Sequence, residues 1–154
     1  MSALWTAVER FLGTEQPAAS GSRPIPDLAE APYARPFWEA AAEERLLVQY
    51  CPACDRHQYF PRPWCAGCAG AVEWTEASGR GTVHSHTVVR RVVSNPGVAE
   101  EVPYATAYVE LDEGPRMMTR LVECDVDAVE RGLPVEVCFD HVTDEVTLPV
   151  FRPR

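Results

Sequence analysis

The chain has 154 residues, of which 46% are hydrophobic, and this is enough to bury the core of one ordinary domain or two small modules. Its formal net charge is −9, which disfavours nucleic-acid binding because basic groups that neutralise phosphates supply most of that affinity. The fourteen lysine or arginine positions are all arginine, so a lysine Schiff base, a lysine general base and a phosphate-loop lysine are excluded.

No apolar run approaches the length that spans a membrane, and the N-terminus lacks the charged and apolar regions of a secretory signal. Four of the six cysteines form closely spaced pairs, and the other two, Cys124 and Cys138, stand singly. Cysteines arranged for a metal are typical of a reducing compartment. We therefore expect a cytoplasmic protein that does not associate with membranes.

The first predicted element is a short amphipathic helix over residues 3–12. Its apolar side chains gather on or beside one face: Leu4, Trp5, Val8, Phe11 and Leu12. In so short a helix this stripe has to pack against the body of the chain or against a partner. Five prolines between residues 14 and 36 then predict an extended linker.

A second helix is predicted over residues 37–46, with Phe37 and Trp38 on its apolar face. Strands are predicted over residues 46–50 and 58–60, on either side of the first cysteine pair. The aromatic residues of this region are expected to form its small core: Tyr50, Tyr59, Phe60 and Trp64. A module of this size cannot bury enough surface without a metal ion.

Two Cys-x-x-Cys pairs flank a ten-residue loop: Cys51 with Cys54, and Cys65 with Cys68. Four soft ligands aimed at one point complete the tetrahedral sphere that zinc prefers, and a closed sphere leaves no position for water. We therefore expect one structural zinc ion per chain, while two disulfides or free thiols are the alternatives. Because Ala69 suits a positive φ poorly, we expect the second turn to bend at Gly67 or Gly70.

Beyond the second cysteine pair the hydrophobic pattern alternates, as in half-buried strands. Five strands are predicted, over residues 82–93, 104–111, 116–123, 133–139 and 146–151. A one-turn helix capped by Asp125 is predicted over residues 126–131, between the third and fourth strands. This is the element order of an OB-fold barrel, and the helix disfavours the alternative of a small β-sandwich.

The predicted fold class is therefore mainly β: N-terminal helices and a four-Cys zinc ribbon, followed by a five-stranded OB-fold barrel. Three parts are expected. Residues 1–36 hold the N-terminal helix and the proline-rich linker, residues 37–76 the second helix and the ribbon, and residues 77–154 the OB-fold domain.

Several separate stretches together resemble the DUF35 family: residues 36–41, 46–54, 60–63, 78–83, 111–114, 132–135 and 148–153. The resemblance covers roughly residues 32–153 and leaves the N-terminal helix outside. It implies an OB-fold protein with a rubredoxin-like zinc ribbon that accompanies an enzyme of the thiolase superfamily. Such a partner is a thiolase, an acyl-CoA-dependent C-acyltransferase or a lipid-transfer-protein-like aldolase of steroid side-chain breakdown. The small protein supports the partner's fold and helps to shape its acyl-CoA entrance.

Four arginines are candidates for contacts to the phosphates of CoA: Arg90, Arg91, Arg116 and Arg120. The alternative is that they are scattered, solvated side chains. Seven apolar residues are candidate anchors at the partner interface: Leu4, Trp5, Val8, Phe11, Leu12, Phe37 and Trp38. We expect two copies of the chain on an enzyme dimer, a heterotetramer with acyl-CoA at a shared site.

No pattern in the chain indicates a catalytic constellation, so we expect a non-catalytic subunit. His84 and His86 share a predicted strand face without a third metal ligand nearby, and two polar residues on the outer face of the barrel is the favoured interpretation. The alternative function is a free-standing module that binds nucleic acid or oligosaccharide, which OB folds and zinc ribbons both support. The acidic charge and the missing lysines favour the accessory subunit.

Overall fold

The computed structural model describes residue 28, residues 31–92 and residues 101–154. The described residues from 28 to 90 and from 103 to 154 belong to one compact unit. The predicted helix over residues 3–12, with its five candidate anchors, lies outside the described residues. Within the described ranges no helix is long and apolar enough to cross a membrane.

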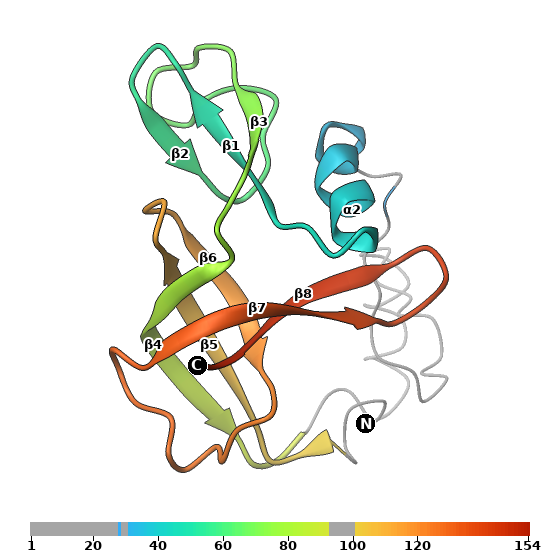
Figure 1. Cartoon of the computed structure of the whole chain (residues 1–154), viewed down its shortest axis with the longest axis vertical. Coiled ribbons are helices and arrows are strands. Elements are labelled where there is room, and N and C mark those ends of the chain that lie inside the picture. The colour runs from blue at the N-terminus through green and yellow to red at the C-terminus, as the bar shows by residue number, and fades with distance from the viewer. Residues whose placement is uncertain (1–27, 29–30, 93–100) are drawn as a thin grey trace, which may run out of the picture. The chain divides into compact units, whose positions relative to one another are not determined.

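A 3-10 helix, η1 (Pro32–Ala34), leads directly into the α-helix α2 (Arg35–Ala42), as Figure 1 shows. Glu44 has a left-handed φ of 57°, and the Arg45 amide donates to the Ala40 carbonyl at 2.9 Å. This bond, together with that from the Glu44 amide to Ala41, forms a Schellman cap. The helix therefore starts and ends earlier than the predicted span of residues 37–46.

The zinc ribbon contains a three-stranded antiparallel sheet in the order β2-β1-β3. Its strands are β1 (Leu47–Cys51), β2 (Arg56–Gln58) and β3 (Glu73–Glu76). Strand β2 lies two residues earlier than predicted, and β3 was not predicted. The expectation that Phe60 and Trp64 belong to the ribbon core is wrong, because these residues are 56% and 57% exposed, whereas Tyr59 does pack against the buried core. Val48, Gln49 and Gln58 are buried instead.

Five strands close a barrel in the order β4-β5-β6-β8-β7, which confirms the predicted five-stranded barrel. They are β4 (Arg80–Val89), β5 (Tyr104–Leu111), β6 (Arg116–Leu121), β7 (Pro134–His141) and β8 (Thr147–Pro153). The parallel pairing of Leu121 on β6 with Phe151 on β8 closes the ring, and both side chains are buried.

A β-bulge in β4 changes which residues share a face. Val83 pairs with Val109 and Ser85 with Tyr108, so His84 is the extra residue. After the bulge, His86 pairs with Ala107 and lies on the face of Val83. The interpretation that placed His84 and His86 together on the outer face is therefore wrong.

The predicted helix over residues 126–131 is also wrong, because the structure has turns in this range. The Asp125 carboxylate accepts the amide of Asp127 at 3.0 Å, and the Asp125 carbonyl accepts the amide of Ala128 at 3.0 Å. These bonds close a single turn that does not continue as a helix. Val129 follows this turn and is buried in the core.

One buried cluster joins residues of the helix and ribbon with those of the barrel. Phe37 from α2, Leu46 and Val48 belong to it together with barrel residues such as Phe151. Phe37 is only 3% exposed and packs inside this chain, which removes it from the candidate interface anchors. Trp38 is half-buried and packs against the cluster from outside.

Candidate metal centre and binding surfaces

The ribbon brings the four predicted ligand residues together. The sulfur atoms of Cys51, Cys54, Cys65 and Cys68 all lie within 4.8 Å of one another. The Cys51 and Cys68 sulfurs are 3.5 Å apart, and those of Cys54 and Cys65 are 3.6 Å apart. A tetrahedral ion with metal–sulfur bonds of about 2.3 Å separates its sulfur ligands by about 3.8 Å. The four thiols therefore fit one metal ion, and none of them is in a disulfide.

The second cysteine turn bends at Ala69, which has a φ of 58°. The expected bend at Gly67 or Gly70 is wrong, and these glycines provide space instead. A Cβ on Gly70 would lie 3.2 Å from the Cys68 sulfur, and a Cβ on Gly67 would lie 2.9 Å from the Arg56 guanidinium. Small residues in this turn therefore let the thiol and the guanidinium approach the backbone closely.

Hydrogen bonds from backbone amides favour the thiolate form of Cys65. Hydrogen bonds from Gly67 and Cys68 lower the pKa of the Cys65 thiol to about 6, and the Gly67 amide lies 3.3 Å from its sulfur. The hydrogen bond to Cys65, followed by burial, raises the pKa of the Cys54 thiol to about 12. Without a cation, four thiolates this close repel one another, and a bound divalent cation favours the thiolate form of all four.

Two buried glutamines hold the loop that leads to the second cysteine pair. Gln49 and Gln58 are opposite each other on β1 and β2, and the Gln58 side-chain amide donates to the Gln49 carbonyl oxygen at 2.8 Å. Gln49 bonds both the amide and the carbonyl of Arg62, at 2.8 and 2.9 Å. Gln58 donates to the Trp64 carbonyl at 3.1 Å and accepts the Ala66 amide at 2.8 Å. Sequence reasoning missed this pair, although a glutamine within a short apolar strand is a signal of a buried polar contact.

The candidate CoA-phosphate arginines differ in their surroundings. Arg90 forms an ion pair with Asp127. The Arg116 Nε atom donates to the Glu110 carboxylate at 2.8 Å, and this bond lowers the pKa of that carboxyl. The four side chains of these pairs are exposed by 45% or more, and an ion pair at such a position contributes little to stability.

Arg120 lies over an aromatic ring, with its guanidinium carbon 4.7 Å from the centroid of Tyr104. Arg116 and Arg120 are four residues apart on β6, which separates their Cα atoms by about 13 Å. Arg91 is exposed. The structure thus places Arg116 and Arg120 on one strand but not in one cluster.

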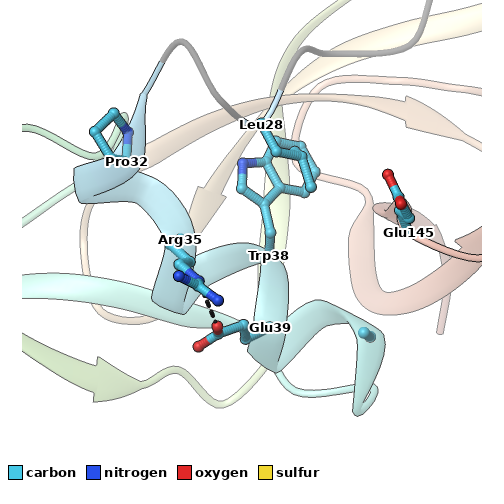
Figure 2. A pocket seen from close by; sticks show the side chains of 7 residues that line it. Leu28, Pro32, Arg35, Trp38, Glu39 and Glu145 are labelled. Atoms are coloured by element: carbon cyan, nitrogen blue, oxygen red, sulfur yellow. Dashed lines mark hydrogen bonds and ion pairs between the residues drawn. The ribbon is translucent and has the colours of Figure 1, made fainter.

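A pocket of about 530 Å³ borders helix α2. It is lined by Leu28, Pro32, Arg35, Trp38, Glu39, Ala42 and Glu145. Figure 2 shows the Trp38 ring, Leu28 and Glu145 around it, with the Arg35 guanidinium bonded to the Glu39 carboxylate at 2.8 Å. Its size falls in the range of small-ligand and side-chain pockets. Trp38, a candidate anchor, therefore borders a concave surface.

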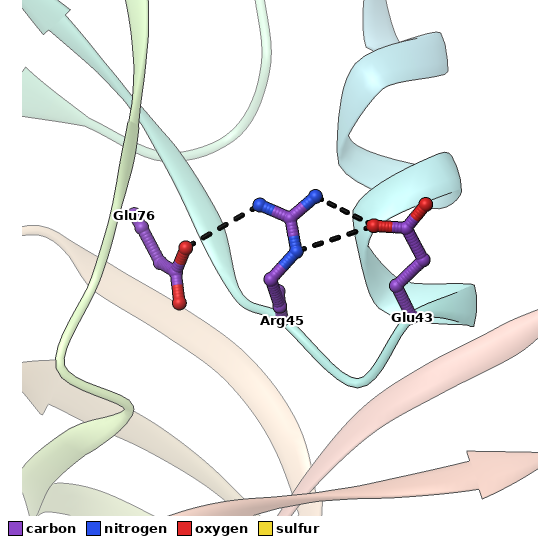
Figure 3. Close-up of polar contacts among 3 residues, drawn as sticks. All are labelled: Glu43, Arg45 and Glu76. Carbon is purple, nitrogen blue, oxygen red and sulfur yellow. Dashed lines mark hydrogen bonds and ion pairs between the residues drawn. The ribbon is translucent and has the colours of Figure 1, made fainter.

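An exposed ion-pair network joins the end of the helix to the ribbon sheet. Arg45 lies between two carboxylates, with distances of 2.7 Å to Glu43 and 3.3 Å to Glu76 (Figure 3). Glu43 caps α2 and Glu76 ends β3. This network links helix and sheet at the surface, and the rings of Phe37 and Tyr59, with centroids 5.8 Å apart, form a second contact between helix and ribbon.

Comparison with known proteins agrees with this architecture. The family model for the rubredoxin-like zinc ribbon domain of ChsH2 matches residues 38–73, and that for the C-terminal OB-fold domain of ChsH2 matches residues 74–140. A probable enoyl-CoA hydratase alpha subunit of Thermomonospora curvata is 43% identical over 120 residues, which are 76% of this chain and 36% of that protein. The chain thus spans about a third of the length of this relative.

A DUF35 domain-containing scaffold protein of Methanothermobacter thermautotrophicus is 34% identical over 102 residues, covering 65% of this chain and 75% of that protein. The solved structure of an Ltp2-ChsH2(DUF35) aldolase matches with a TM-score of 0.71 and 37% identity, covering 85% of this chain and 98% of that one. The two family models match the ribbon and the barrel of this chain, and the scaffold protein is a DUF35 relative. The chain therefore belongs to the DUF35 family.

Proposed function

We propose that this chain is a non-catalytic accessory subunit of an acyl-CoA enzyme of the thiolase superfamily and helps to form its acyl-CoA site. The observation that carries the proposal is the likeness to the Ltp2-ChsH2(DUF35) aldolase, whose name joins a DUF35 protein to an enzyme activity. The Thermomonospora curvata relative is likewise named as one subunit of an enzyme that acts on a CoA ester.

The polar contacts of the barrel support a non-catalytic role. The Thr147 hydroxyl lies 2.9 Å from one ring nitrogen of His141, and the Glu44 carboxylate lies 3.2 Å from the other. This order of groups resembles a nucleophile–base–acid arrangement, but Thr147 is only 3% exposed, so a substrate cannot reach its hydroxyl.

The thiols of Cys124 and Cys138 also support a non-catalytic role. Burial raises the pKa of the Cys124 thiol and of the Cys138 thiol above the ordinary value. Because the thiolate is the reactive form, both are poor nucleophiles at neutral pH.

The metal in this proposal is one zinc ion, held by Cys51, Cys54, Cys65 and Cys68. Four sulfur ligands fill a tetrahedral sphere and leave no open position, so the ion has a structural role. It holds the two cysteine turns together in a module whose hydrophobic core is small. Phe60 and Trp64, two of the large apolar residues of the ribbon, are exposed and add little to that core.

Four arginines are the groups that we propose for contacts to the CoA phosphates: Arg90, Arg91 and Arg116, which are exposed, and Arg120, which is partly buried. Arg90 and Arg116 would exchange the carboxylates of Asp127 and Glu110 for phosphate oxygens. Such an exchange costs little, because the present pairs are exposed and a phosphate accepts two hydrogen bonds from one guanidinium.

Co-expression with a candidate thiolase-superfamily enzyme from the same organism tests the proposal. We expect one complex, with two copies of each protein, in size-exclusion chromatography with light scattering. If the two proteins elute separately at micromolar concentration, and the enzyme is equally soluble and active alone, the chain is not its accessory subunit.

A further inference from the structure

The ribbon presents two large aromatic side chains to solvent on one short loop. Phe60 and Trp64 are 56% and 57% exposed, and the residue midway between them, Arg62, is exposed as well. Pro61 lies between the two and is buried, so the backbone of the loop packs against the ribbon while much of each aromatic side chain stays exposed. Residues 60–64 form the ribbon loop.

The backbone of the ribbon loop is held in one conformation. Gln49 bonds both polar backbone groups of Arg62, and Gln58 bonds the Trp64 carbonyl. Pro61 and Pro63 restrict φ at two of the five positions. The loop therefore loses little conformational entropy when a partner covers it, which is the condition under which exposed aromatics bind strongly.

Two exposed arginines lie on the ribbon loop or against the cysteine turn that follows it. Arg62 and Arg56 are exposed, and neither forms an ion pair with any residue of the ranges 31–92 and 101–154. Arg56 lies against the second cysteine turn, where the space at Gly67 admits its guanidinium. In a chain of net charge −9, Arg62 on the ribbon loop and Arg56 beside the turn that follows the loop are therefore basic groups without a carboxylate partner in the described ranges.

A second exposed apolar pair lacks these properties and serves as a comparison. Tyr108 on β5 and Met118 on β6 are opposite each other in register and are 48% and 63% exposed. Two arginines flank Met118 at equal spacing on β6: Arg116 is bonded to Glu110, and Arg120 lies over the Tyr104 ring. Exposure of apolar groups alone therefore does not distinguish the ribbon loop, whereas its rigid backbone and unpaired arginines do.

We propose that the ribbon loop docks on the partner enzyme, where Phe60 and Trp64 enter an apolar depression and Arg56 and Arg62 pair with carboxylates at its rim. This inference rests on the proposed function and names the surface and the chemistry of the contact. Trp, Phe and Arg are the residue types that dominate interface energies when a partner excludes water from them. Two arginines on an acidic protein suit a carboxylate rim better than a nucleic-acid backbone, which requires many more basic contacts.

The test uses the full chain and its purified thiolase-like enzyme, with the dissociation constant measured by isothermal titration calorimetry. The double variant Phe60→Ala/Trp64→Ala is expected to weaken the complex at least about 30-fold, the effect of losing one strong interface anchor. Tyr108→Ala/Met118→Ala is the matched control and is expected to stay within about 3-fold of wild type. The reversal Arg56→Glu/Arg62→Glu is expected to weaken the complex most at low salt.

Zinc content and circular dichroism of each variant report whether the ribbon is intact. If Phe60→Ala/Trp64→Ala binds the enzyme with wild-type affinity, the ribbon loop is not the docking site, while the accessory role stands. If wild type itself does not bind, the proposed function and this inference both fail. Anisotropy with a 20-nucleotide single-stranded RNA covers the other ligand class. Sub-micromolar binding that the aromatic variant abolishes would assign the loop to nucleic acid instead.

Discussion

Gly81 on β4 lies directly against the backbone of Glu110 on β5. A Cβ on Gly81 would be 2.4 Å from the Glu110 carbonyl oxygen and 2.8 Å from a Val109 methyl group. Gly81 also pairs with Val135 on β7, so it lies where three barrel strands meet. We expect Gly81→Ala to lower the free energy of unfolding by about 2–3 kcal/mol, as other overpacked core sites do. Urea denaturation measures this.

Gly114→Ala is the control for this prediction. Gly114 has a φ of 102°, but a Cβ there meets nothing within 4 Å. Its substitution should cost only the backbone strain, about 1 kcal/mol. Equal effects of the two substitutions would show that the contact at Gly81 does not limit the packing of the barrel.

The glutamine pair of the ribbon predicts a coupled loss of stability. Gln58→Leu removes one of the two donors to the Gln49 side-chain oxygen, which keeps the Arg62 amide, and it leaves the Trp64 carbonyl and the Ala66 amide without their Gln58 partner. Unsatisfied buried groups cost about 1–3 kcal/mol each, so we expect a loss of at least about 2 kcal/mol in urea denaturation of the metal-loaded protein. The double variant Gln49→Leu/Gln58→Leu should lose less than the sum of the two single variants. Strict additivity would mean that the two side chains act independently.

Removal of one sulfur ligand is expected to release the metal. Wild type should hold one zinc ion per chain, and Cys65→Ser should hold much less, because a structural zinc site needs all four ligands. Cys138→Ser is the control, since this thiol lies on β7 outside the sulfur cluster. Elemental analysis counts the metal, and far-ultraviolet circular dichroism follows the ribbon. Well under one zinc per wild-type chain would contradict the assignment.

The parts of the fold that could be predicted from the sequence are those with a local pattern, such as the cysteine spacing and the alternation of apolar residues. The spacing of the cysteine pairs identified the sulfur cluster, because each pair is a self-contained turn. Alternation predicted the bounds of β5 over residues 104–111 without error, since this strand has one buried and one more exposed face. The order of such strands was then sufficient for the barrel.

The features that sequence could not predict depend on contacts between distant segments. The bulge at His84 is defined by pairing with β5, more than twenty residues away, and it reversed the faces of half a strand. Phe60 and Trp64 were expected inside because they are aromatic. They are outside because buried glutamines, not aromatic rings, hold the ribbon loop. At residues 126–131 a hydrogen bond from the Asp127 amide to the Asp125 carboxylate stabilises a turn where propensity allowed a helix.

The Arg116–Glu110 pair predicts a dependence of stability on pH. The hydrogen bond from Arg116 holds the pKa of the Glu110 carboxyl below its ordinary value of 4.5. A carboxyl with a lowered folded pKa contributes stability above its unfolded pKa, and this contribution is lost as the pH falls through the folded value. Arg116→Gln should therefore unfold at a lower temperature than wild type at pH 7, and the difference should shrink below pH 4.5.

Acid also releases thiolate-bound metal, so wild type and variant are compared at each pH rather than across pH. Arg116→Lys is the control, because it keeps the charge beside Glu110 and loses part of the hydrogen bonding. It should lie between wild type and Arg116→Gln. A melting-temperature difference that does not change between pH 7 and pH 3 would show that Glu110 does not titrate with this pair.

The end of helix α2 offers a substitution that should stabilise the protein. Glu44 occupies the left-handed position of a Schellman cap with a φ of 57°, where a side chain costs about 1–2 kcal/mol and glycine costs nothing. Glycine also makes the unfolded chain more flexible, which offsets part of this gain, so we expect Glu44→Gly to raise the free energy of unfolding by about 0.5–1 kcal/mol. Glu44→Ala keeps the backbone strain and removes only the carboxylate that contacts His141 at 3.2 Å, so it isolates the contribution of that exposed contact. Urea denaturation of the two variants separates the two effects, and a Glu44→Gly protein no more stable than Glu44→Ala would mean that the cap is not strained.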